Sequence, residues 1–148
     1  MVADRIERQV FIQADLERVW WLVSKAGFFI GDALHFEYDA AEGETVVVDA
    51  GQYGRFPVRV ERLDPPRHVA YRCWEGERPD GALTEDGSTL VEFTLREQDG
   101  GVLVMLVESG FAALPGDVST QEQRREENVE GWAMQLGRLQ GVAEGADR

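Results

Sequence analysis

The chain has 148 residues, of which 43% are hydrophobic and 29% charged, and this is the composition of a soluble globular protein that can bury a core of its own. No apolar run reaches the length of a membrane-spanning helix. The 28 acidic residues outnumber the 15 basic ones, which gives a net charge of −13 without any basic window, so we expect no nucleic-acid partner.

Metal and cofactor signatures are missing from the sequence. The single cysteine, Cys73, excludes an internal disulfide and a cysteine-based zinc cluster. The two histidines, His35 and His68, are not accompanied by clustered cysteines or carboxylates, and there is no glycine-rich phosphate loop or nucleophile elbow. The first nine residues contain several charges and no signal-peptide core. We therefore expect one cytoplasmic domain over residues 1–148, without metal or cofactor.

A strand and a short helix are predicted at the start of the chain. Residues 5–13 alternate between apolar and polar side chains, which indicates a strand with one buried face. Asp15 suits the N-cap of a helix that has Val19, Trp20 and Val23 on its apolar face. Glycines 27 and 31 end this helix, and residues 31–43 fit either a short strand or an ordered loop.

The middle of the chain predicts five antiparallel strands, at residues 44–49, 54–63, 68–74, 88–97 and 102–109. Asp64-Pro65-Pro66 forces a turn after the second of these strands. Asp99-Gly100 is a hairpin signal between the last two. Residues 75–87 are acidic and glycine-rich, so they predict a solvated loop.

A long helix is predicted from Ser119 to about Ala143. Ser119 and Glu122 have the spacing of a capping box. An apolar stripe with the period of one helix face follows, formed by Val129, Trp132, Leu136, Leu139 and Ala143. Gly131 and Gly137 lie inside this helix and each costs about 1 kcal/mol relative to alanine, so we expect a close backbone approach there.

Together these elements predict an α+β fold in which a curved antiparallel sheet wraps around the C-terminal helix. Hairpin-linked strands with one apolar face need a cover, and the last helix is the only long amphipathic one predicted. Such an arrangement often leaves a cavity between sheet and helix, where a small apolar molecule can bind.

Several motifs that follow one another along the chain point to a known family. They are Ile12-Gln13-Ala14 before Val19-Trp20, Gly54-x-Phe56 before Val60 and Asp64-Pro65-Pro66-Arg67, Tyr71, Glu108-Ser109-Gly110-Phe111, and Gly131-Trp132 with Leu136 and Leu139. In this order they resemble the START-like (SRPBCC) superfamily, in the branch related to the activator of the heat-shock-protein-90 ATPase. The resemblance covers nearly the whole chain and implies a helix-grip fold with a hydrophobic cavity.

Two departures from the family pattern bear on the cavity. Cys73 stands where the family often has a tryptophan, and Trp74, displaced by one position, is expected on the opposite face of its strand. Phe28-Phe29 replaces the usual tryptophan after the first helix. Because both changes reshape the cavity, the resemblance does not carry over a ligand class.

The expected ligand-binding residues lie on facing surfaces of the sheet and the helix. They are Phe36, Phe56, Val58, Tyr71, Cys73, Phe93, Glu108, Trp132 and Leu136. For the apolar members the competing interpretation is ordinary core packing. Tyr71 is the strongest candidate among the aromatic residues, because a buried phenol needs a hydrogen-bond partner that a ligand can supply.

Glu108 has two interpretations, because its strand is apolar on both faces. An inward carboxylate would have a raised pKa and could act as an acid/base or as a ligand anchor. The alternative, which we favour from the sequence, is a carboxylate near the strand end that is solvated or paired with an arginine such as Arg72.

Three functions remain open at this point. The leading hypothesis is binding of a small hydrophobic molecule in the cavity. The second is a cyclase- or dehydrase-like enzyme, as some superfamily members are, which would require Glu108 and Tyr71 to converge. The third is a co-chaperone that acts on a heat-shock protein 90 through its surface. The fold alone does not decide among them.

Overall fold

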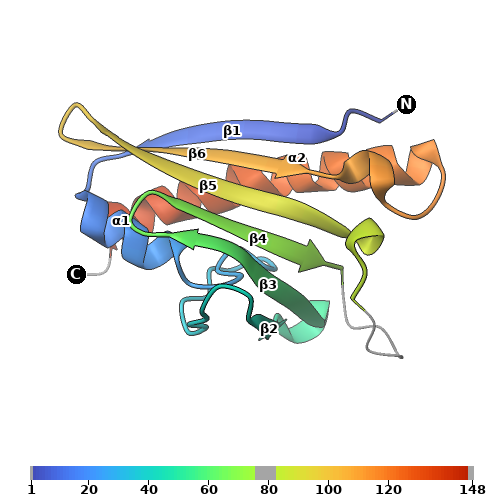
Figure 1. Cartoon of the computed structure of the whole chain (residues 1–148). Helices are drawn as coiled ribbons and strands as arrows, with labels where there is room; N and C mark the ends of the chain where they lie inside the picture. Colours follow the sequence, from blue (N-terminus) through green and yellow to red (C-terminus); the bar gives the residue numbers. More distant parts are fainter. Residues whose placement is uncertain (1, 76–82, 147–148) are drawn as a thin grey trace.

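The computed structural model describes residues 2–75 and 83–146. Within them, six strands and two α-helices follow in the order β1 (Arg5–Ile12), α1 (Leu16–Val23), β2 (Thr45–Asp49), β3 (Arg55–Asp64), β4 (His68–Trp74), β5 (Ser88–Gln98), β6 (Gly101–Ser109) and α2 (Val118–Gly141) (Figure 1). The predicted strands are all present, and residues 31–43 form a loop. Part of the loop predicted at 75–87 lies outside the described residues.

The strands form one antiparallel sheet in the order β1-β6-β5-β4-β3-β2. The first strand pairs with the last, so that Val10 lies opposite Val104, and the other strands follow as a meander. The register shifts between Val60 and Arg62 in the pairing of β3 with β4. Figure 1 shows the sheet curving around α2, which runs behind β1 and β6. The predicted α+β architecture is therefore confirmed.

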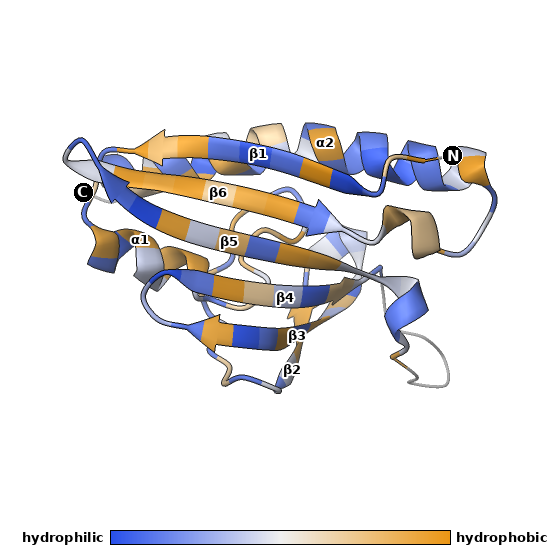
Figure 2. Cartoon of the chain, turned by 45° about the horizontal axis from the view of Figure 1, so that its top comes forward, coloured by the Kyte–Doolittle hydropathy of each residue, from blue (hydrophilic) through white to orange (hydrophobic). Residues whose placement is uncertain are grey.

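The core lies between the concave face of the sheet and α2. Along β6 the inward residues Val102, Val104 and Leu106 are buried, which settles the face that the sequence left open. From α2 the side chains of Trp132, Leu136 and Leu139 join the same cluster, with Val129 partly buried beside them, and Ala143 joins it from the π-helical segment Val142–Ala146. Figure 2 shows the resulting contrast, since β6 is hydrophobic along most of its length whereas the outer side of α2 is largely hydrophilic.

The start of α2 differs from the prediction. Asp117 and not Ser119 is the N-cap, because its carboxylate accepts a hydrogen bond from the backbone N–H of Thr120 at 2.8 Å. Gly116 precedes it at φ 106°, a left-handed conformation that suits glycine and turns the chain into the helix. Ser119 and Glu122 are exposed residues within the helix, so the predicted capping box is wrong.

The expectation that the two glycines inside α2 mark a close backbone approach is wrong. A Cβ atom added to Gly131 or Gly137 would meet no atom within 4 Å, so neither marks a close backbone approach. The close approach occurs instead at Gly27, where an added Cβ would lie 2.5 Å from Cγ2 of Val48. Gly27 therefore lets the loop after α1 pack directly against β2.

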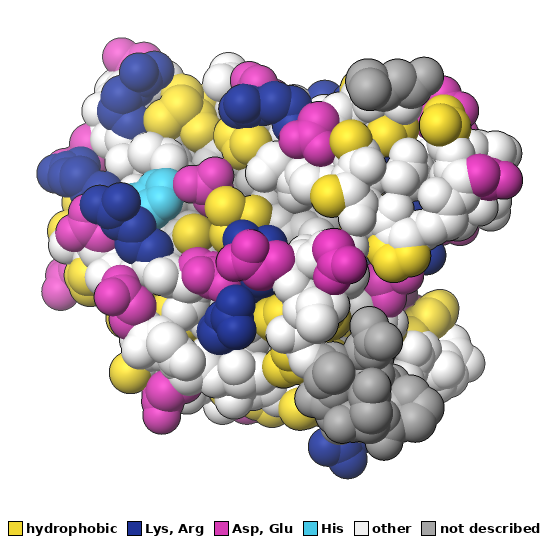
Figure 3. All heavy atoms as spheres, turned by 45° about the vertical axis from the view of Figure 1, so that its right-hand side comes forward, with side chains coloured by type: hydrophobic (Ala, Val, Ile, Leu, Met, Phe, Trp, Pro, Cys, Tyr) yellow, Lys and Arg dark blue, Asp and Glu magenta, His cyan; other side chains and the backbone are white. Residues whose placement is uncertain are grey.

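No helix in the described ranges is long and apolar enough to cross a membrane. On the face shown in Figure 3, Lys and Arg side chains are interspersed with Asp and Glu side chains. The net charge of the chain, −13, favours protein or small-molecule partners over polyanions.

Candidate functional site

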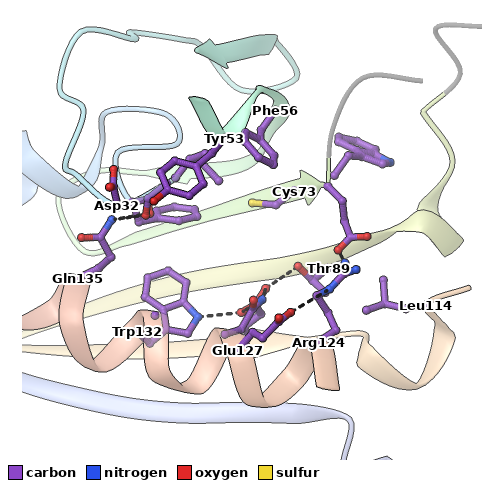
Figure 4. Close-up of a pocket in the computed structure, with 18 of the residues that line it drawn as sticks. Asp32, Tyr53, Phe56, Cys73, Thr89, Leu114, Arg124, Glu127, Trp132 and Gln135 are labelled. Carbon is purple, nitrogen blue, oxygen red and sulfur yellow. Dashed lines mark hydrogen bonds and ion pairs between the residues drawn. The ribbon is translucent and has the colours of Figure 1, made fainter. Parts of the chain in front are cut away.

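A cavity of about 640 Å³ lies between α2 and the sheet, at the end of the sheet where β4 stops and β5 begins. Figure 4 shows its two sides, with Trp132, Glu127 and Arg124 projecting from α2 and with Tyr53 and Phe56 facing them. The apolar part of its lining consists of Phe29, Ile30, Tyr53, Phe56, Cys73, Trp74, Leu114 and Trp132. The polar part consists of Asp32, Glu75, Thr89, Glu108, Arg124, Glu127, Asn128 and Gln135.

Glu108 lies in the inner wall of this cavity and is only 3% exposed. Its Oε1 atom accepts a hydrogen bond from Trp132 Nε1 at 2.7 Å, and its Oε2 atom accepts one from Thr89 Oγ1 at 2.6 Å. The Asn128 side-chain amide donates to both oxygens at 3.1 Å. Both carboxylate oxygens are therefore held by donors from β5 and α2.

Two opposing effects act on the Glu108 carboxyl. Burial disfavours the charged form, whereas the hydrogen bonds from Thr89, Trp132 and Asn128 favour it. Burial outweighs the hydrogen bonds, so the pKa of Glu108 is raised above its ordinary value of 4.5. A carboxyl with this pKa shift can hold or release a proton inside the cavity.

The favoured expectation that Glu108 is solvated or paired with Arg72 is wrong. Arg72 lies on the opposite face of the sheet, where its Nε donates to Glu61 at 3.0 Å and its Nη1 donates to Ser88 at 3.1 Å. The side-chain alternation along β4 separates it from Cys73, which faces the cavity. The side chain of Glu108 instead points into the cavity, as the other interpretation required.

Replacing Glu108 by glutamine is expected to remove a pH dependence of stability. Because the folded chain keeps this proton at pH values where the unfolded chain has lost it, the free energy of unfolding falls as pH rises from 4.5 toward the raised native pKa. The Glu108→Gln variant should therefore gain stability relative to the parent over that window. Urea unfolding at a series of pH values measures the difference.

Glu61→Gln is the matched control with the opposite sign. Burial raises the pKa of Glu61, but the hydrogen bonds and charges of Arg59 and Arg72 outweigh it and hold this pKa below 4.5. Glu61 therefore stabilises the fold above its ordinary pKa, and this contribution is lost as pH falls. Glu61→Gln should lose stability relative to the parent as pH rises. Difference curves of the same slope for both variants would contradict the assignment of Glu108.

The predicted ligand-binding residues divide into two groups. Phe56, Cys73, Glu108 and Trp132 line the cavity together. Phe36, Val58, Tyr71, Phe93 and Leu136 lie outside its lining and pack in or against the hydrophobic core. The rings of Phe28 and Phe29 fill the space next to one member of this second group, Phe93, at 5.1 and 5.8 Å between centroids.

Tyr71 does not need a ligand as its hydrogen-bond partner. Its hydroxyl donates to the backbone carbonyl of Val23 at 2.6 Å, and its side chain is fully buried. Burial raises the pKa of the phenol, with a smaller contribution from Cys73, so the phenol stays protonated and serves as a structural donor. Tyr71 therefore connects β4 to the end of α1 and does not converge with Glu108.

Cys73 faces the cavity beside Glu108. Burial raises the pKa of its thiol, and the negative charge of Glu108 raises it further, with Arg72 opposing them. The thiol is therefore a weakly reactive, apolar part of the wall. Among the described residues, no group of three His, Cys, Asp or Glu side chains is placed to hold a metal ion.

Gln135 is the main site residue that the sequence analysis missed. It is 4% exposed, and its side-chain nitrogen donates to the backbone carbonyls of Phe29, Gly31 and Ala33 at 2.9, 3.1 and 3.0 Å. These bonds attach one wall of the cavity to α2 (Figure 4). A polar residue directly before Leu136 in the apolar stripe was the available signal.

The sheet, the C-terminal helix and the cavity between them define a helix-grip protein of the START-like (SRPBCC) class. The sequence profile of one family in this class, described as "Activator of Hsp90 ATPase homolog 1-like protein", matches residues 9–144. The chain therefore belongs to this family, and the predicted relationship is confirmed. A comparison with curated proteins gives no match.

Solved structures share the fold at low sequence identity. DynU16, from the dynemicin biosynthetic locus, is 20% identical with a TM-score of 0.70; the alignment covers 97% of this chain but only 48% of DynU16. The Aha1 dimer from Colwellia psychrerythraea is 17% identical with a TM-score of 0.71, over 97% of this chain and 98% of that one. A protein from Arthrobacter aurescens is 14% identical with a TM-score of 0.72, over 95% and 86%.

Proposed function

We propose that this protein binds a small, mainly apolar molecule in the cavity between α2 and the sheet. The observation that carries the proposal is the cavity of about 640 Å³, walled by Phe29, Phe56 and Trp132. Ligand sites in proteins are typically concave, mostly apolar and equipped with a few fixed polar groups. Glu108, held by three side chains, supplies such a group in the inner wall.

The two alternative functions receive less support. The acid/base enzyme needs Glu108 and Tyr71 in one site, but the Tyr71 hydroxyl is bonded to Val23 and the residue lies outside the cavity lining. A co-chaperone that acts through its surface does not require an apolar cavity of this size. Its support is the family description, which concerns an activator of the Hsp90 ATPase.

A neutral fluorescent reporter tests the proposal directly. N-phenyl-1-naphthylamine should bind with a saturable rise in fluorescence, because its rings match an aromatic cavity. Binding should also raise the melting temperature by mass action, since a ligand at 100 times its Kd stabilises the folded state by about 2.7 kcal/mol. A linear, non-saturating signal without a shift in melting temperature would refute ligand binding in the cavity.

A further inference from the structure

Among the described residues that line the cavity, acidic side chains outnumber basic ones. Four of its lining residues are acidic, namely Asp32, Glu75, Glu108 and Glu127, whereas Arg124 is the one basic side chain among the described lining residues. Arg124 is already engaged, because it forms an ion pair with Glu75 and its Nε lies 4.0 Å from Glu127. An anionic ligand would therefore meet carboxylates without a free basic partner in the described lining.

Glu108 is the acidic residue that most needs a positive partner. All three of its hydrogen-bond donors are neutral side chains, and in the described part of the chain it forms no ion pair. Trp132 Nε1 and the Asn128 amide nitrogen can only donate, so these two partners favour the ionised carboxylate against the effect of burial. A buried carboxylate is costly unless a cation compensates its charge.

The cavity walls also suit a cation. Trp132 and Phe29 lie side by side, with 4.9 Å between their ring centroids, and Tyr53 and Phe56 face them across the cavity (Figure 4). Aromatic faces attract organic cations, most strongly where water is excluded. Acidic and aromatic groups thus surround the same space.

We propose that the ligand of this cavity is an apolar molecule that carries one protonated amine, positioned between the aromatic walls and the Glu108 carboxylate. This inference rests on the proposed function and specifies its ligand class. Both oxygens of Glu108 already accept hydrogen bonds from the protein, so the carboxylate attracts the amine mainly through its charge.

A series of three ligands with one skeleton tests the charge preference. 4-Phenylbutylamine, 4-phenylbutan-1-ol and 4-phenylbutanoate compete at pH 8 with the neutral reporter N-phenyl-1-naphthylamine. We expect the amine to bind about tenfold more tightly than the alcohol, from cation–π attraction and the charge of Glu108, and the carboxylate to bind most weakly.

Two variants locate the source of the preference. In Glu108→Gln the amide oxygen can accept from Trp132 and Asn128 and the amide nitrogen can donate to the Thr89 hydroxyl, so only the bond from Asn128 to Oε2 is lost. This variant should bind amine and alcohol within about twofold of each other while still binding the reporter. Glu122→Gln changes the net charge equally on an exposed position of α2, outside the cavity, and should keep the preference.

The outcomes separate this inference from the proposed function. If the reporter binds the parent protein but the amine is not preferred over the alcohol, the amine ligand is refuted and apolar binding stands. If Glu108→Gln keeps the full preference, the role of Glu108 is refuted. If the reporter does not bind the parent, the proposed function itself fails. The parent protein alone decides the first and third outcomes, so the test does not depend on the folding of a variant.

Discussion

Replacing Phe93 by alanine is expected to lower the free energy of unfolding by about 3–5 kcal/mol, the range for buried aromatic residues. Phe93 is fully buried on β5, and its ring lies 5.1 Å from that of Phe28 and 5.8 Å from those of Phe29 and Trp132. It therefore joins the sheet, the loop after α1 and α2 in one aromatic cluster. Truncation to alanine leaves a cavity. The surrounding rings belong to three different elements, namely the sheet, the loop after α1 and α2, so they cannot move together to fill it. Urea unfolding at neutral pH measures the loss.

Phe56→Ala is the matched control for this experiment. Phe56 is also an aromatic residue of the sheet, but it is only partly buried and lines the ligand cavity. Its truncation should cost clearly less stability than that of Phe93 and should weaken binding of the reporter. Equal losses of stability in the two variants would contradict the division between core and cavity.

Replacing Gly131 by tryptophan is expected to abolish reporter binding without unfolding the protein. Gly131 lies on α2 in the cavity wall, and an added Cβ meets no atom within 4 Å, so the new side chain can start from this position without a clash. Glycine inside a helix costs about 1 kcal/mol relative to alanine, so the backbone itself should be stabilised by losing it. Fluorescence titration and thermal unfolding of the same sample measure both effects.

Gly137→Trp provides the control on the same helix. A Cβ added to Gly137 also meets no atom within 4 Å, but Gly137 is exposed and lies outside the cavity lining. The two variants share the change in helix propensity and in side-chain volume, and they differ only in where the side chain points. Unchanged reporter affinity in Gly131→Trp would show that binding takes place elsewhere.

The fold could be predicted because its signals are local. The alternation along β3 and β5, the turns at Asp64-Pro65-Pro66 and Asp99-Gly100, and the stripe on α2 each depend on residues that are close in sequence. The helix cap was misplaced by two positions because Asp117 and Ser119 are both good capping residues. Only the turn at Gly116 decides between them.

The division of the aromatic residues could not be predicted in the same way. Alternation puts Tyr71 and Phe93 on the concave face together with Cys73, but it does not say which end of that face stays empty. This depends on the loop after α1, whose conformation the sequence left open. The loop places Phe29 at 5.9 Å from Tyr71 and 5.8 Å from Phe93, where it fills the space next to them.

The interactions of Glu108 needed the tertiary structure for a similar reason. Its three donors come from β5 and α2, and Thr89 and Trp132 are 43 residues apart in the numbering of the chain (132 − 89). The spacing of Asn128 and Trp132, four residues along one helix face, was a usable signal for a pair of donors. The sequence alone does not tell which acceptor they share.

The bonds of Gln135 make one side chain of α2 responsible for the position of a cavity wall. This one side chain shares two N–H donors among the carbonyls of Phe29, Gly31 and Ala33, and so fixes the distance between the loop and α2. A shorter or longer residue at this position would change that distance and, because Phe29 belongs to the same loop, would also shift its ring against Phe93. A single helix position therefore controls the cavity wall, and a designer who wants to admit bulkier molecules has one place to start.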